Sequence, residues 1–273
     1  MNNMDKKDKN YVFYDLETNG LDYYTTGILQ ISILNDKDDI LLDQYVYPFD
    51  NRIDCTDIHN IDQKKLIDNN AISTKDLCTL IKNIIRKKYD REDVYFVAYN
   101  NFGYDQIILE NNFKISDIRI PSNWYFIDLF PIIKDIYTDI KPNYKLKTVY
   151  EFLFNNIDEK INFHSALDDT KCVLKIFKII QDKEEVIKKY TRSLLSNNEI
   201  FNFPITSFYG YHKSMNFENK GVNTIGDMFE IFKLNDRNMD KFVRYLQTKL
   251  NVYSLFYINN IIKQINIINY LIS

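Results

Sequence analysis

Over its first two-thirds, the chain alternates short β-like runs with longer segments of helical periodicity. Residues 11–17, "YVFYDLE", indicate a strand. The runs "GILQISILN" and "ILLDQYVYP", separated by the charged turn "DKDD", predict a hairpin. From Ser73 to Tyr89, apolar residues recur at helical spacing behind a Ser or Thr that can cap the helix. The chain therefore begins with three strands and a helix.

The same alternation continues to about residue 182. Two further strands are predicted by "VYFVAYN" and "NWYFIDLF", and three further helices by "YDQIILENNF", "YKLKTVYEFLF" and "SALDDTKCVLKIFKIIQ". This order of elements is typical of an α/β layer protein with a mixed sheet flanked by helices.

The pattern changes near residue 190. Polar and proline breaks follow in "SLLSNNEIFNFPITS", and helices are again predicted by "TIGDMFEIF", "MDKFVRYLQTKL" and "YINNIIKQINIINYLI". We therefore expect one domain over residues 1–190 and a smaller, mainly helical C-terminal region over residues 191–273. That region could bind nucleic acid or a protein partner, which the sequence does not identify.

Composition narrows the possible partners. The formal net charge of −3 gives no general basic field, so nucleic acid would have to bind local patches. Candidate patches are Lys141, Lys145 and Lys147, and "RKKYDR" at 86–91. The three scattered cysteines suggest a reduced intracellular compartment, and the chain lacks a signal-peptide pattern and any apolar run of about 20 residues. We expect a soluble, cytoplasmic protein without a membrane partner.

Two acidic residues interrupt the first predicted strand. Asp15 and Glu17 are two positions apart, so they would lie on one face of it. Two carboxylates in a dry sheet repel each other and are costly to desolvate, whereas a hard divalent cation such as Mg²⁺ would bind both. The alternative is that Glu17 begins a solvated turn that leads to Asn19 and Gly20, and this short motif leaves both interpretations open.

Further acids lie near helix starts. Asp105 follows the strand that ends at Ala98, where it could also serve as a helix-terminal acid. In "FHSALDDT", Ser165 and Asp168 have the spacing of a capping box, with Asp in place of the preferred Glu or Gln. Asp169 would lie on another face of that helix, and His164, just before it, is a candidate general base.

Three motifs in this order resemble the DnaQ-like 3′→5′ exonucleases of the DEDDh type, which have an RNase H-like fold. They are Asp15-x-Glu17, Asn100-x-x-x-Tyr104-Asp105 and His164-x-Ala166-x-x-Asp169, and the resemblance covers roughly residues 10–182. The segments "ETNGLD", "IHNID" and "FIDLF" fall where this family has them. The chain differs in having Tyr99-Asn100 where many relatives have His-Asn, and Asn60 where they have Gly.

The resemblance implies a set of site residues. Asp15, Glu17, Asp105 and Asp169 would hold two Mg²⁺ or Mn²⁺ ions about 4 Å apart. His164 would take the proton from the attacking water. Five further residues would border the terminal nucleotide or shape the site: Thr18, Leu21, His59, Asn100 and Tyr104.

The function implied is a metal-dependent 3′→5′ exonuclease. It would hydrolyse phosphodiester bonds at the 3′ ends of single-stranded or frayed DNA, in proofreading, repair or degradation. One alternative is an exoribonuclease with the same residues, because recognition of the 2′-OH depends on pocket shape. Another is an inactive nuclease fold that only binds nucleic acid, although the complete set of four acids and a histidine argues against it.

Overall fold

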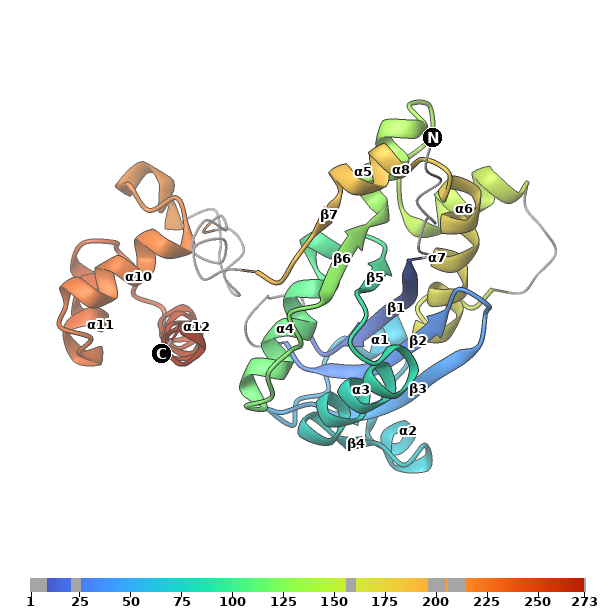
Figure 1. The fold of residues 1–273 in the computed structure, drawn as a ribbon. Coiled ribbons are helices and arrows are strands. Elements are labelled where there is room, and N and C mark those ends of the chain that lie inside the picture. The colour runs from blue at the N-terminus through green and yellow to red at the C-terminus, as the bar shows by residue number, and fades with distance from the viewer. Residues whose placement is uncertain (1–8, 21–25, 156–160, 196–204, 206–214, 273) are drawn as a thin grey trace. The chain divides into compact units, whose positions relative to one another are not determined.

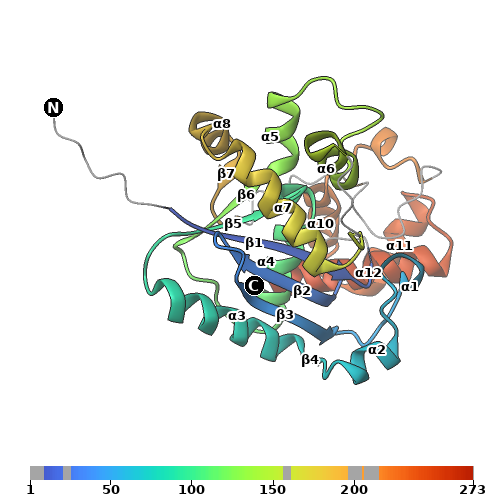
Figure 2. The same cartoon turned by 90° about the vertical axis from the view of Figure 1, so that its right-hand side faces the viewer.

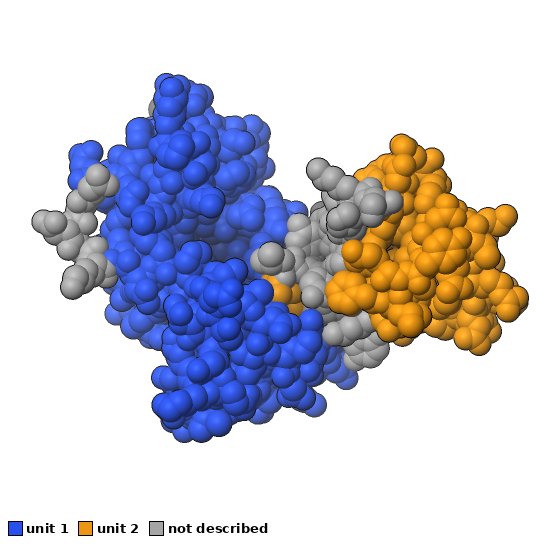
Figure 3. Space-filling model, turned by 180° about the vertical axis from the view of Figure 1, so that it is seen from behind, with its two compact units in different colours: residues 1–19, 27–194 blue, residues 20–26, 195–273 orange. Residues whose placement is uncertain are grey.

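A computed structural model describes residues 9–20, 26–155, 161–195, 205 and 215–272. The chain divides into two compact units, which Figure 3 colours separately. The first comprises residues 1–19 and 27–194, and the second comprises residues 20–26 and 195–273.

The first unit is built on a seven-stranded mixed sheet in the order β4-β3-β2-β1-β5-β6-β7 (Figure 1). Its strands are β1 (Asn10–Thr18), β2 (Ile28–Asn35), β3 (Ile40–Tyr47), β4 (Ile72–Ser73), β5 (Val94–Ala98), β6 (Trp124–Asp128) and β7 (Thr191–Arg192). The first three pair antiparallel, as the predicted hairpin requires, and β5 and β6 continue the sheet parallel to β1. The expected mixed sheet is confirmed.

Helices follow most of the strands. They are α1 (Thr56–His59), α2 (Gln63–Asp68), α3 (Thr74–Tyr89), α4 (Asp105–Ile115), α5 (Leu129–Ile136), α6 (Leu146–Phe154), α7 (Ala166–Ile180) and α8 (Glu184–Lys189), with a 3₁₀ turn, η1 (Asn101–Gly103), before α4. Ser73 caps α3 as predicted, since its side chain accepts from the Asp76 N–H. The predicted strand at 123–130 ends earlier, because Asp128 caps α5 through the Phe130 N–H.

Helices cover both faces of the sheet (Figure 2). Val12, Tyr14 and Leu16 of β1 pack in a core with α3 and α4. Phe13 points to the other face, where its ring lies 5.3 Å from that of Phe177 in α7. Because strand side chains alternate, Asp15 and Glu17 emerge on the face that α7 covers.

The second unit is helical in its described part, as the sequence predicts. Its elements are a 3₁₀ turn, η4 (Glu218–Lys220), and the helices α10 (Ile225–Leu234), α11 (Met239–Thr248) and α12 (Leu255–Ile272). A capping box between Thr224 and Asp227 begins α10, and Phe232 packs edge-on against Phe242 of α11. None of the helices described in either unit is long and apolar enough to cross a membrane.

Candidate active site

Three carboxylates meet where β1 passes under the start of α7. Asp15, Glu17 and Asp169 each present an oxygen, and these oxygens lie within 4.8 Å of one another. One Asp169 oxygen accepts the main-chain N–H of His164 at 3.0 Å, and the other is buried without a hydrogen-bond partner. Oxygen ligands with an unmet acceptor are the donor set that Mg²⁺ and Mn²⁺ prefer. The residues present therefore fit a divalent cation.

The electrostatics of this cluster point the same way. Burial raises the pKa of Glu17 to about 7, and the negative charge of Asp169 adds to the shift. Burial also raises the pKa of Asp169 to about 7, although the hydrogen bond from the His164 N–H opposes it. The pKa of Asp15 is raised well above its usual range by burial and by the charges of Asp169, Asp105 and Glu17. A divalent cation would let all these carboxyls ionise at neutral pH.

Asp105 lies beside this cluster rather than in it. It is the first residue of α4 and is buried, and α4 has no side-chain N-cap. Burial and the neighbouring Asp128 raise the pKa of Asp105 well above its usual range, while hydrogen bonds from the Asp105 and Leu16 N–H groups oppose this. Its charge in turn acts on Asp15, so the fourth predicted acid is an electrostatic neighbour of the three that form the cluster.

Two residues that the sequence analysis did not identify make contacts with the segment around Asp105, which comprises η1 and the first turn of α4. Asp128, at the end of β6, accepts the N–H groups of Phe102 and Phe130, both at 2.9 Å. The Arg192 guanidinium of β7 lies 3.9 Å from the centre of the Phe102 ring and donates to the Gln106 side chain at 2.7 Å. Asp128 lies in the "FIDLF" segment, so the resemblance to the exonuclease family could have identified it. Arg192 lies where the hydrophobic pattern of the chain changes, and nothing in the sequence there indicates a role for it.

The two adjacent asparagines at the end of β5 have different roles. Asn100 is exposed at φ 58°, and its side-chain oxygen would lie 2.6 Å from a Cβ placed on Gly103. Asn101 is fully buried: it accepts the Tyr14 hydroxyl at 2.5 Å and donates to the main-chain carbonyls of Phe96 and Ile127. Asn100 thus shapes the turn, and Asn101 ties β1, β5 and β6 together.

The remaining predicted nucleotide-binding residues differ in how close they lie to the acids and in which contacts their polar groups make. The hydroxyls of Thr18 and Tyr104 lie 2.5 Å apart, beside Glu17 and Asp105 in the sequence. His59 is buried, and its Nδ1 accepts the Ile61 N–H at 3.0 Å, so its Nε2 must carry the proton that faces the Asp54 carbonyl at 2.9 Å. Both ring nitrogens are therefore engaged within the protein. Leu21 lies outside the described residues.

His164 lies at the rim of the site. It is exposed, with φ 68°, and its ring is near enough to His59 to help lower the pKa of that buried histidine, which burial already depresses. The predicted capping box behind it is wrong, because Ser165 makes no side-chain cap. Asp168 instead accepts the Asn162 N–H at 3.3 Å and pairs with Lys171 at 3.5 Å.

The exonuclease family RNase_T matches residues 12–177, which is more than half of the chain. The chain belongs to this exonuclease family. The matched range contains every acid of the candidate site and His164. The predictions of a DnaQ-like exonuclease domain, and of an enzyme of the nuclease class, are confirmed by this match.

Similar proteins cover the chain only in part. A segment of 86 residues is 29% identical to the chloroplastic/mitochondrial exonuclease DPD1 of Arabidopsis thaliana, covering 31% of this chain and 27% of that protein. Escherichia coli exonuclease I, in a zinc-bound complex with single-stranded DNA, matches with a TM-score of 0.54 at 15% identity. Its complex with a dA16 oligonucleotide gives the same values, and both matches cover 67% of this chain and 43% of exonuclease I.

These matches confirm the predicted RNase H-like fold. The chain spans less than half of the length of each of these relatives.

Proposed function

We propose that this protein is a metal-dependent 3′→5′ exonuclease that removes nucleotides from single-stranded or frayed DNA. The observation that carries the proposal is the group of three carboxylates from β1 and α7, in which one buried Asp169 oxygen has no partner. Membership of the exonuclease family supports hydrolysis of phosphodiester bonds at nucleic-acid ends.

Each residue has a role in this proposal. Asp15, Glu17, Asp105 and Asp169 would hold two Mg²⁺ or Mn²⁺ ions, which, when bound, activate a water and stabilise the leaving oxygen. The exposed His164 imidazole would accept the proton of the attacking water. Its main-chain bond to Asp169 fixes the turn that carries it.

The other predicted residues are proposed to line the site of the terminal nucleotide. The hydrogen-bonded hydroxyls of Thr18 and Tyr104 join the strand of Glu17 to the helix of Asp105, so a nucleotide over the acids would meet them. Leu21 and Asn100 are proposed to border the same site. His59, whose ring nitrogens are both engaged, would contribute packing rather than a hydrogen bond.

DNA is proposed as the substrate because the similar solved structures are complexes of exonuclease I with single-stranded DNA. An exoribonuclease is the second candidate. Proofreading, repair and degradation are all compatible with this chemistry. We also propose a nuclease domain over residues 1–190, a C-terminal region over 191–273 that binds nucleic acid or a protein, and an intracellular location, which the three free cysteines support.

The test is a degradation assay on 3′- and 5′-labelled DNA and RNA oligonucleotides with Mg²⁺, Mn²⁺ or EDTA. We expect laddering from the 3′ end that requires metal and is lost in Asp15→Asn. The control is Asp182→Asn, which changes an exposed aspartate paired with Lys183. Faster cleavage of RNA than of DNA would favour the exoribonuclease. Binding of nucleic acid without cleavage under any metal would favour an inactive nuclease fold that only binds nucleic acid.

A further inference from the structure

A pocket of about 360 Å³ lies between the C-terminal half of α3 and the segment that leads into β6. Three cationic side chains line it, those of Lys82, Arg86 and Arg91, against the single acid Asp90. Ser122 and Asn123 add polar groups opposite the helix. The pocket thus has a local charge of +2 in a chain whose formal net charge is −3.

These three cations differ from other basic side chains of this unit. Among the described residues, none of them forms a salt bridge, although Asp90 lines the same pocket. Elsewhere in this unit, exposed lysines do find partners, such as Lys64 with Asp68 and Lys189 with Asp135, both at 2.6 Å. Neighbouring positive groups that outnumber the acid beside them favour binding of an anion.

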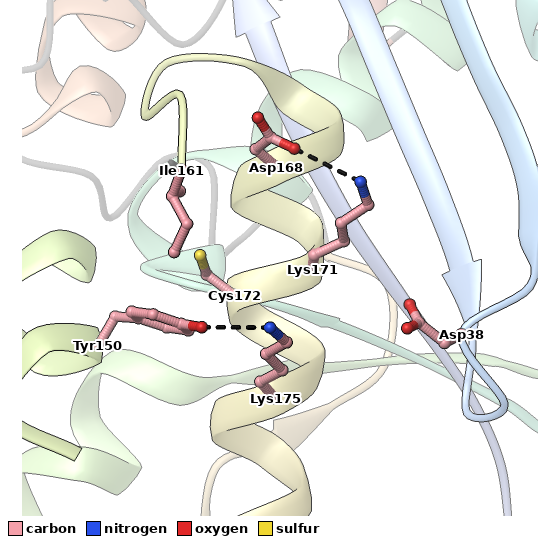
Figure 4. A pocket seen from close by; sticks show the side chains of 7 residues that line it. All are labelled: Asp38, Tyr150, Ile161, Asp168, Lys171, Cys172 and Lys175. Carbon is pink, nitrogen blue, oxygen red and sulfur yellow. Dashed lines mark hydrogen bonds and ion pairs between the residues drawn. The ribbon is translucent and has the colours of Figure 1, made fainter. Parts of the chain in front are cut away.

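A second pocket of about 360 Å³, beside α7, provides a comparison (Figure 4). Its lysines are engaged within the pocket itself: Lys171 pairs with Asp168 at 3.5 Å, and Lys175 donates to the Tyr150 hydroxyl at 3.3 Å. The two pockets are equal in volume, so what distinguishes the first is its uncompensated charge.

The cationic pocket lies at the end of the sheet away from the acids. Arg91 precedes β5, and Trp124, another lining residue, is the first residue of β6. Trp124 pairs with Val94 of β5, which in turn pairs with Asn10 at the start of β1. Asp15 and Glu17 lie five and seven residues further along β1 and on the other face of the sheet from α3, so at about 3.3 Å per residue they are at least about 16–23 Å away. One phosphate cannot reach both places.

We propose that this pocket binds a backbone phosphate of the nucleic acid whose 3′ end lies over the acids. The inference rests on the proposed function. Guanidinium groups grip phosphate oxygens in a bidentate way, and a lysine adds a point charge. At about 3.4 Å per nucleotide of a stacked strand, the separation corresponds to at least about five to seven nucleotides. The pocket would therefore favour substrates longer than this and leave the chemistry unchanged.

The test compares two charge-reversed variants of the full-length chain. Arg86→Glu/Arg91→Glu alters the pocket, and Lys87→Glu/Lys88→Glu makes the same change in net charge at neighbouring exposed positions outside it. Affinity for a 20-nucleotide single strand is measured by fluorescence anisotropy in EDTA, over a range of salt concentrations. Turnover of a dinucleotide is measured with Mg²⁺.

We expect the pocket variant to bind the 20-mer at least 10-fold more weakly. Losing the one phosphate contact should also reduce the magnitude of its salt slope by about 0.7. Dinucleotide turnover should stay within about 2-fold, because a dinucleotide leaves no phosphate for the pocket, and the control should match the unaltered protein. Equal weakening in both variants, or none in either, would overturn the proposal.

Two further readouts separate other causes. If inorganic phosphate binds the unaltered protein and is lost in the pocket variant while 20-mer affinity is unchanged, the pocket takes free phosphate, and the backbone assignment is wrong. If binding of the 20-mer depends on the pocket but no substrate is ever cleaved, the proposed function fails and the binding site stands.

Discussion

The main-chain N–H of His164 donates a 3.0 Å hydrogen bond to the carboxylate of Asp169, so the proposed base is joined to a proposed metal ligand through its backbone. His164 has φ 68°, a left-handed conformation that Asn and Gly adopt most readily. The imidazole takes no part in this bond. The side chain can therefore be changed without loosening Asp169.

This separation predicts the effect of His164→Asn. Asn keeps the left-handed backbone and the hydrogen bond to Asp169 but cannot accept the proton, so kcat should fall by about 10²–10⁴-fold. The metal concentration that gives half-maximal activity should stay within about 2-fold, as measured by titrating Mg²⁺ or Mn²⁺ in a cleavage assay. A large loss of metal affinity would show that the side chain acts on the ligands instead of on the water.

The raised pKa values predict how stability depends on pH without metal. The pKa values of Glu17 and Asp169, both raised to about 7 from usual values near 4, mean that the folded chain holds more protons there than the unfolded chain. The free energy of unfolding contributed by these groups should therefore fall as pH rises from about 4 to 7. Each 1 kcal/mol lost would lower Tm by about 2–4 °C.

Divalent metal should reverse this trend, because it competes with protons for the same oxygens. We expect Mg²⁺ to raise Tm more at pH 8 than at pH 5, as measured by calorimetry in EDTA and in excess Mg²⁺. The double variant Glu17→Gln/Asp169→Asn is the control and should weaken both effects, because only Asp15 and Asp105 of the four acids remain. A Mg²⁺ effect that is equal at both pH values would count against carboxylate ligation at this cluster.

Arg192→Ala tests the support behind Asp105. It removes the contact with the Phe102 ring and the bond to the buried Gln106, which should cost about 1–3 kcal/mol of unfolding free energy. If Arg192 positions Asp105, the metal concentration for half-maximal activity should also rise about 10-fold or more.

Lys189→Ala is its matched control, since it breaks the pair between Lys189 and Asp135 on the surface. Exposed pairs contribute at most about 1 kcal/mol, so activity and metal requirement should not change. A less stable Arg192→Ala protein with an unchanged metal requirement would make Arg192 purely structural.

Much of this site follows from the sequence, for a physical reason. Alternation along β1 requires Asp15 and Glu17 to share a face, and the structure places them under α7, as Phe13 and its contact with Phe177 show. The sequence could not specify which of several nearby hydrogen-bond partners a polar side chain contacts. Asp168 turns to the Asn162 N–H and Lys171, because these lie within reach, and so forms no capping box.

Asn101 is the plainest case, because only the packed sheet distinguishes it from Asn100. Asn101→Ala would leave the Tyr14 hydroxyl and the Phe96 and Ile127 carbonyls without their buried partner. We expect a loss of about 1–3 kcal/mol in chemical denaturation. Asn100→Gly keeps the left-handed turn and should cost less than about 1 kcal/mol. Equal losses in the two variants would contradict the assignment.

Asp15→Asn should stabilise the metal-free protein while it abolishes activity. Burial and the charges of Asp169, Asp105 and Glu17 raise the pKa of Asp15, so its carboxyl costs folding free energy that no cation offsets in EDTA, and the Asn side chain removes that cost. We expect Tm in EDTA at pH 8 to rise by about 2–4 °C, which corresponds to about 1 kcal/mol. The rate of cleavage should fall at least about 100-fold, because the metal site loses one of its proposed carboxylate ligands. Asp182→Asn, two residues beyond the end of α7 at Ile180, should leave both quantities unchanged. A drop in Tm would instead mean that Asp15 is held by contacts that favour its charged form, and the repulsion argument for a metal at this cluster would fail.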